Sequence, residues 1–147
     1  MLKYKFMKVI SFEEYGSSEV LKISSADIPE LNPNEVLLKV YAAGVNRPDL
    51  LQREGKYLPP KDASKILGLE ASGEIVLKGK KVSKWNIGDK VTALLHGGGY
   101  AEYVKVHENH CLVIPDGISM IDAAGLCENY FTVWSNIFSK GILKKNQ

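Results

Sequence analysis

The sequence predicts a mainly β fold, a compact and partly open barrel with helices appended at its C-terminal end. Short alternating or apolar segments, bounded by glycine, proline or asparagine, recur along the chain as far as Ile114, a pattern typical of antiparallel sheets and barrels. After Pro115-Asp116-Gly117 this pattern gives way to apolar residues at helical spacing. The 147 residues, 45% of them apolar, are enough for one ordinary domain with a genuine core.

Seven or eight short strands are expected. Three of them fall before residue 42, which favours an antiparallel sheet or barrel over alternating strands and helices. Pro29 ends the second strand, and Pro59-Pro60 makes the stretch after Tyr57 a loop, because proline can complete neither a helix nor a strand ladder. The expected strands are residues 7–12, 20–28, 35–41, 68–76, 90–95, 100–106 and 111–114.

The C-terminal part of the chain is predicted to be helical. Ser119 followed three residues later by Asp122 resembles a capping box, and it opens a helix over residues 120–126. Glu128-Asn129 is expected to interrupt the helical pattern. Residues 130–139 then form a strongly apolar helix that ends at Lys140-Gly141.

Composition and charge exclude several classes of function. The 19 basic and 17 acidic residues are mixed along the chain, the formal net charge is +2, and no basic run is longer than two lysines. Nucleic-acid and membrane-surface binding therefore lack their usual electrostatic footprint. No apolar run approaches bilayer-spanning length, and the N-terminus lacks the apolar centre and cleavage site of a signal peptide. We expect a soluble, cytoplasmic protein whose partners are neither nucleic acid nor membrane.

The segment between the third strand and the double proline is the candidate site. Asn46 suits a helix cap and Gly55 suits the end of a short helix, so the segment is predicted to run as strand, cap, helix and stop. Loops on a rigid scaffold are common places for functional residues. Asn46, Arg53 and Tyr57 are expected to face one concavity. The alternative is an ordinary capped crossover without a functional role.

Other residue types that often mark a site lack the necessary context. Gly97-Gly98-Gly99 lies between two strands rather than before a helix, so it is interpreted as a flexible hairpin and not as a phosphate cradle. The histidines at positions 96, 107 and 110 have no ligand spacing with the two cysteines, so a bound metal is not expected. Cys111 and Cys127 are interpreted as small core residues.

Two sets of residues resemble a known family. The broader set is Gly68-x-Glu70-x-x-Gly73, Gly79, Trp85, Gly88-Asp89, Gly99 and Tyr100-Ala101-Glu102-Tyr103. On these residues the chain is similar to the GroES-like catalytic domain of the medium-chain dehydrogenase/reductase superfamily, from about residue 7 to residue 141. The narrower set, Asn46-x-x-Asp49-x-x-x-Arg53-x-Gly55-x-Tyr57, resembles the quinone oxidoreductase branch that includes zeta-crystallin. The resemblance implies NADPH-dependent reduction of quinones or α,β-unsaturated carbonyls.

The resemblance also assigns roles to individual residues. Zinc-dependent members carry a cysteine where this chain has Asn46 and a histidine where it has Leu69, so a zinc-free reductase is expected. The resemblance implies that Asn46 and Tyr57 line the nicotinamide and substrate pocket and that Thr132 touches the cofactor. Leu51 stands where branch members often have a second tyrosine.

A second domain is implied as well. In the family, a helix like residues 130–139 leads into a dinucleotide-binding (Rossmann) domain whose first strand carries a glycine fingerprint, and no fingerprint appears before Gln147. The expected organisation is a GroES-like catalytic domain over residues 7–126 and a helix with the start of a linker over residues 127–147. The domain that holds most of the NADPH is then absent from this chain, which is expected to be a fragment that is inactive alone.

Two non-catalytic interpretations stay open. A family member without activity would bind nucleotide or another protein, as a crystallin-type structural protein does, and a free-standing GroES-like module would bind a partner through its last helix. That helix is expected to leave an apolar face uncovered, and such a face promotes homo-oligomers. The residues of this face are Phe131, Trp134, Ile137 and Phe138.

Overall fold

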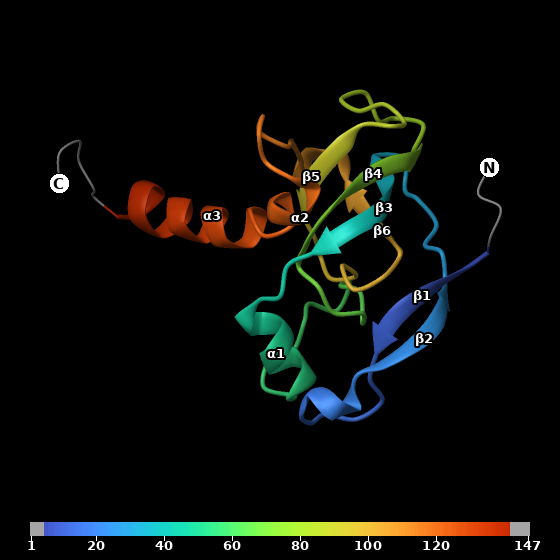
Figure 1. Cartoon of the computed structure of the whole chain (residues 1–147), viewed down its shortest axis with the longest axis vertical. Coiled ribbons are helices and arrows are strands. Elements are labelled where there is room, and N and C mark those ends of the chain that lie inside the picture. The colour runs from blue at the N-terminus through green and yellow to red at the C-terminus, as the bar shows by residue number, and fades with distance from the viewer. Residues whose placement is uncertain (1–4, 142–147) are drawn as a thin grey trace.

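The computed structural model describes residues 5–141, and it shows a body of antiparallel sheet from which a helical arm extends (Figure 1). The strands are β1 (Phe6–Ser11), β2 (Lys22–Asp27), β3 (Glu35–Ala43), β4 (Glu70–Lys78), β5 (Lys90–Leu94), β6 (Tyr103–His107) and β7 (Cys111–Val113). The α-helices are α1 (Arg47–Arg53), α2 (Met120–Ala123) and α3 (Cys127–Val133); η1 (Ser18–Val20) and η2 (Glu108–His110) are short 3-10 helices, and η3 (Trp134–Ser139) is a π-helix.

The strands form two sheets that do not close on each other. Five of them pair in the order β6-β3-β4-β5-β7, and β1 pairs with β2 in a separate ribbon. The segment before β6 joins the two sheets, because Val9 forms a bridge with Ala101 and the Ile10 amide donates to the Tyr100 carbonyl at 2.8 Å. The predicted mainly β, partly open barrel with appended helices is confirmed. Val20, expected in the second strand, lies in η1 instead.

The core lies against the five-stranded sheet. Alternate residues of β3, Val36 and Leu38, are fully buried and pack with Ile75 of β4 and Val91 of β5. Removing these side chains from water supplies the main driving force for folding. The core makes the sheet a rigid support for the helices at its edge. Its other buried members are Ala71, Val82, Ala93, Leu95, Val104, Val106 and Cys111.

Hydroxyl groups of the sheet hold α2 in place. Ser72 of β4 donates from its side chain to the Met120 carbonyl, and Thr92 of β5 donates to the Ala123 carbonyl at 2.6 Å. Ser72 and Thr92 are 0% and 2% exposed. Carbonyls of a helix that lack a partner within the helix are thus satisfied by the sheet. This contact determines where α3 begins.

The predicted interruption of the helical tail at Glu128-Asn129 is wrong. α2 ends at Ala123, the break falls between Ala123 and Cys127, and α3 runs through Glu128. The reason is a contact that is distant in sequence, since the Glu128 amide donates to a carboxylate oxygen of Glu70 at 2.9 Å and so completes the first turn of α3. The arm ends at Ser139, as Lys140-Gly141 predicted.

The helical arm leaves its apolar side chains outside the body, as expected. Phe131 and Ile137 are each 40% exposed, Phe138 is 52% exposed and Trp134 is 63% exposed. The rings of Trp134 and Phe138 pack against each other at a tilt of 34°, with centroids 5.0 Å apart. None of the helices within residues 5–141 is long and apolar enough to cross a bilayer.

Candidate functional site

The segment that follows β3 folds as predicted into a capped short helix. The backbone amide of Asn46 donates to the Asp49 carboxylate at 2.9 Å, and the backbone amide of Asp49 donates to the backbone carbonyl of Asn46 at 3.1 Å. Together these bonds satisfy amide groups that the start of a helix otherwise leaves without partners. Gly55 has a φ of 74°, which suits glycine at the end of a helix. α1 is therefore fixed to the end of β3.

Two buried carboxylates lie at this helix, one on α1 itself and one on β4. Asp49 is 2% exposed and Glu70 is 1% exposed. Asn46 donates from its side-chain amide to Glu70 at 2.8 Å, and the first turn of α3 supplies the second donor to Glu70. Gly44 makes room for this carboxylate, because a Cβ at position 44 would overlap it. Glu70 thereby connects α1, β4 and α3 in one hydrogen-bonded group.

Tyr100 completes the group. Its hydroxyl lies 3.2 Å from a carboxylate oxygen of Asp49, to which it donates, and 3.3 Å from the Gly44 carbonyl. Burial raises the pKa of Tyr100 well above its usual range, and the charges of Asp49 and Glu70 add to the effect. The phenol therefore stays protonated and acts as a donor to Asp49.

The triple glycine is a packed segment rather than the flexible hairpin expected from the sequence. The Gly99 amide donates to the Gly68 carbonyl at 3.0 Å, and the Gly98 amide donates to the Ile66 carbonyl at 2.7 Å. A Cβ at Gly68, where φ is 102°, would lie 2.7 Å from the Gly99 Cα. The backbone segments at Gly68 and Gly99 can approach this closely because neither residue has a side chain. This packing also holds the Gly68 amide against Asp49, at 2.9 Å.

A cleft of about 240 Å³ lies beside this group, between α1, the loop that follows it, the end of β5 and the start of α3. Its walls expose polar and apolar surface in about equal amounts, and the polar groups come from Gln52, Tyr57, Ser64, His96 and Glu128. Tyr57 is 40% exposed. The remaining lining residues are Pro48, Pro59, Pro60, Ala63, Leu69, Leu94, Leu95 and Gly97. Polar groups that converge beside apolar side chains in a small cleft are typical of a ligand site.

Among the residues that the structure describes, Glu128 is the one carboxylic acid that lines this cleft. Partial burial raises the pKa of its side chain, and the negative charges of Glu70 and Asp49 raise it further. The neutral acid is the form that such surroundings favour. The cleft therefore combines a phenol, an imidazole and a carboxylic acid with a raised pKa.

The structure separates the residues that the sequence places together. Tyr57 lines the cleft, whereas Asn46 is 9% exposed and lies behind the cleft wall with its amide on Glu70. Thr132 is exposed on α3 and is not among the lining residues. Asn46 thus supports the wall, and Tyr57 is the one of the three that a ligand in the cleft would meet.

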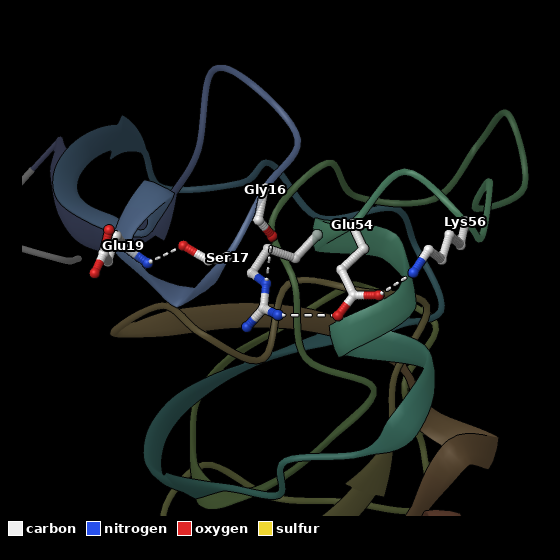
Figure 2. A network of polar contacts seen from close by, with 6 residues as sticks. Gly16, Ser17, Glu19, Glu54 and Lys56 are labelled. Atoms are coloured by element: carbon white, nitrogen blue, oxygen red, sulfur yellow. Dashed lines mark hydrogen bonds and ion pairs between the residues drawn. The ribbon is translucent and has the colours of Figure 1, made fainter.

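The expectation that Arg53 faces the same concavity is wrong. Its guanidinium donates to the Gly16 carbonyl at 3.1 Å and pairs with Glu54 at 3.3 Å, while Lys56 pairs with the other oxygen of Glu54 at 3.0 Å. Figure 2 shows this network, in which the loop at Gly16 lies against the end of α1. Arg53 therefore ties the N-terminal loop to α1.

A larger groove of about 740 Å³ lies on the other side of the loop that follows α1. Its lining includes the apolar side chains of Met7, Val104 and Val106 and the imidazoles of His107 and His110. It shares Ala63, Ser64, His96 and Gly97 with the smaller cleft, but neither Tyr57 nor Glu128 lines it. The smaller cleft is the better candidate site because the buried carboxylates lie directly behind it.

Sequence reasoning missed Glu70, Tyr100 and Glu128 as members of the site. Glu70 and Tyr100 entered only as parts of a family motif, and Glu128 was interpreted as a helix break. A usable signal was present for Glu70, because an acidic residue inside an apolar strand requires buried partners. No local signal indicates Glu128, since its position in the cleft depends on a contact with a residue 58 positions away.

Comparison with known proteins identifies the family. Residues 32–116 match the alcohol dehydrogenase GroES-like domain. The chain is 35% identical over 134 residues to the synaptic vesicle membrane protein VAT-1 homolog of Danio rerio, covering 90% of this chain and 28% of that protein. It is 31% identical over 145 residues to the quinone oxidoreductase of Lama guanicoe, covering 97% of this chain and 44% of that protein.

Solved structures agree with this result. The crystal structure of human synaptic vesicle membrane protein VAT-1 homolog-like protein superposes with a TM-score of 0.88 at 28% identity, over 95% of this chain and 45% of that one. The chain thus spans less than half the length of these relatives. It belongs to the alcohol dehydrogenase GroES-like domain family, among the quinone oxidoreductase-type members of the medium-chain dehydrogenase/reductase superfamily.

Proposed function

We propose that this domain forms the substrate side of an NADPH-dependent reductase of quinones or α,β-unsaturated carbonyls. The observation that carries the proposal is the cleft that Tyr57 and Glu128 line, on a domain whose relatives include proteins named quinone oxidoreductases. Such substrates are flat, apolar rings with a carbonyl oxygen at the edge. The prolines and leucines of the lining suit the ring, and the polar groups suit the oxygen.

The cleft fits the nicotinamide end of the cofactor but not the whole of it. A volume of about 240 Å³ is below the usual 300–1,000 Å³ of a drug-sized pocket, so it suits one or two rings rather than a dinucleotide. The triple glycine joins β5 to the segment before β6 and opens no helix, so it does not form a phosphate cradle for the pyrophosphate. We propose that a second domain holds the remainder of NADPH.

NADPH supplies the hydride when it is bound, and the domain supplies orientation and a dry surface. Tyr57 would donate a hydrogen bond to the substrate carbonyl oxygen, which gains negative charge as the hydride is accepted. Pro48 and Leu69 would exclude water from one face of the ring. Asn46 would act from behind the wall, by fixing Glu70 and with it the start of α3.

The proposed chemistry does not use zinc. The side chain of Leu69 has no atom that could bind zinc, and the side-chain amide of Asn46 is already hydrogen-bonded to Glu70. Within the described part of the chain, no three histidine, cysteine, aspartate or glutamate side chains are grouped to hold a metal ion. These observations support a reductase in which the cofactor and the polar groups of the cleft suffice.

The proposal is tested in the full-length protein that carries this domain. NADPH oxidation is followed with 1,4-naphthoquinone and with a cyclic enone, for the wild type and for Tyr57→Phe. Loss of one buried hydrogen bond in the transition state is expected to lower kcat/KM about 10- to 100-fold, on the order of 1–3 kcal/mol, with an unchanged unfolding midpoint. Tyr41→Phe is the matched control, because Tyr41 is 67% exposed on β3.

The outcomes separate the candidate functions. A wild-type rate with both substrates for Tyr57→Phe would remove Tyr57 from the site. Saturable NADPH binding with no turnover of either substrate by the wild type would favour the non-catalytic binding module over the reductase.

A further inference from the structure

We propose that Glu128 is the acid that protonates the substrate in this cleft. The proposal rests on the reductase function proposed above and adds a catalytic residue to it. Hydride transfer to a quinone or an enone leaves a negative charge on the substrate oxygen, and a proton has to follow from a group within reach. Tyr57, His96 and Glu128 are the side chains of the cleft lining that can carry such a proton.

The position of Glu128 is fixed by its own backbone. Its amide donates to the buried carboxylate of Glu70 at 2.9 Å, which holds the first turn of α3 against the end of the sheet. The side chain then lies at the cleft wall and is partly buried. The amide that would stabilise a Glu128 anion at the start of α3 is already bonded to Glu70, so the helix end does little to favour ionisation of Glu128.

The charges around Glu128 also favour its neutral form. Glu70 on β4 and Asp49 on α1 are both buried and both raise the pKa of Glu128, after the larger effect of its own burial. Cys127, next to it on α3, has a raised pKa and adds no charge in the neutral range. His96 faces the same cleft, but its ring lies 3.3 Å from Asp62 on the opposite side, where a positive charge would be paired.

The chemical step balances with the reductant that the proposed function supplies. A hydride, with its two electrons, adds to the substrate, and the electrons of the substrate double bond move to its oxygen. The O–H bond of the Glu128 carboxyl group breaks as a new O–H bond forms at that oxygen. Glu128 is left as a carboxylate and regains a proton from water at the mouth of the cleft.

The test compares Glu128→Gln with the wild type in the full-length protein, using NADPH and 1,4-naphthoquinone. Glutamine keeps the size and a hydrogen-bonding end but carries no transferable proton. We expect kcat to fall about 100-fold, in the range typical for general acid catalysis, while the KM for NADPH changes less than twofold. Glu128→Asp should recover part of the lost rate. Glu74→Gln is the control because Glu74 is an exposed carboxylate on β4.

The dependence of kcat on pH gives a second readout. The wild-type rate should fall as pH rises through the pKa of Glu128, because the acid form is the reactive one, and Glu128→Gln should lose this dependence. A wild-type rate and an unchanged pH profile for Glu128→Gln would overturn the proposal. Loss of the pH dependence in His96→Gln instead would assign the proton to His96 and would also overturn it.

A titration without turnover keeps the proposal separate from the reductase function. In the carbon NMR spectrum of the full-length protein, the carboxyl signal that disappears in Glu128→Gln should titrate above the ordinary range of glutamate. Titration within or below that range would overturn the proposal even if the enzyme is active. An inactive wild type with a raised Glu128 titration would count against the reductase function, and with it against the role of Glu128 as proton donor.

Discussion

Asn46 and Glu70 illustrate how single residues hold this site. The side-chain amide of Asn46 is one of two hydrogen-bond donors to the carboxylate of Glu70, a residue that is 1% exposed. When a buried charged group loses a hydrogen-bond donor, its desolvation is no longer compensated and the folded state is destabilised. Asn46 therefore contributes mainly to the stability of the fold, and it affects the cleft only indirectly, by holding Glu70 in place.

Asn46→Ala is predicted to destabilise the fold by about 2–3 kcal/mol, because it leaves one oxygen of Glu70 without its partner. The free energy of unfolding in urea measures the effect. Tyr57→Phe serves as the comparison and should change stability by less than about 0.5 kcal/mol, since it alters an exposed hydroxyl. Equal stability of Asn46→Ala and the wild type would show that the buried bond to Glu70 contributes nothing.

For single residues, the sequence predicts the start and the end of the short helix α1. It does not predict the distant hydrogen-bond partners of the side chains. The cap at Asn46 and the stop at Gly55 follow from short-range backbone rules, and the structure confirms both. The bond from Asn46 to Glu70 joins residues 24 positions apart, and the role of Arg53 depends on the loop at Gly16. No pattern within α1 specifies either contact.

The elements of this fold depend on the sheet to different degrees. Strands β1 to β7 were predicted from alternation and turn residues, because half-buried strands carry that pattern in their own sequence. α2 is a helix of 4 residues and cannot be stable alone, since isolated helices of that length do not form in water. Its place is set by hydroxyls on β4 and β5, and the position of α3 follows from it.

Thr92→Val tests this dependence. Valine keeps the shape of threonine but removes the donor to the Ala123 carbonyl, so we predict a loss of about 1–2 kcal/mol. Hydrogen exchange should become faster in residues 120–133 and stay unchanged in β3. Ser24→Ala is the control, because Ser24 bonds to Ser11 in the separate ribbon. Unchanged exchange in residues 120–133 would contradict an anchoring role for Thr92.

The wrong prediction at Glu128-Asn129 belongs to the same scale. Two polar residues before an apolar run predict a break in the helix. The sequence contains no sign that the buried carboxylate of Glu70 will accept a hydrogen bond from the backbone amide of Glu128. The apolar face of the arm was read correctly from helical spacing. Homo-oligomer formation through that face stays a prediction.

The molecule as a whole should lose stability in alkaline solution. Burial raises the pKa of Cys111 to about 12, with smaller effects from Cys127 and Glu108, and the pKa of Tyr100 is raised as well. A raised folded-state pKa means that stability is fully present below the pKa of the unfolded chain and is lost as pH rises above it. The loss should begin near pH 9 for Cys111, where the unfolded thiol ionises.

Urea unfolding between pH 8 and pH 11 measures this loss. Cys111 alone should account for about 2 kcal/mol at pH 10.5, from the difference between its folded and unfolded pKa. Cys111→Ala should remove that part of the pH dependence while the contribution of Tyr100 remains. Parallel profiles for the wild type and Cys111→Ala would contradict the assignment to Cys111.

A crystal structure of the full-length protein with NADP and 1,4-naphthoquinone would show whether the cleft beside Tyr57 and Glu128 binds the substrate. We expect the quinone ring to lie in the 240 Å³ cleft, with its oxygen within hydrogen-bond distance of Tyr57 or Glu128 and the nicotinamide against its face. A ring bound instead in the groove between Met7 and Val104, with the cleft beside Tyr57 left to water, would contradict it.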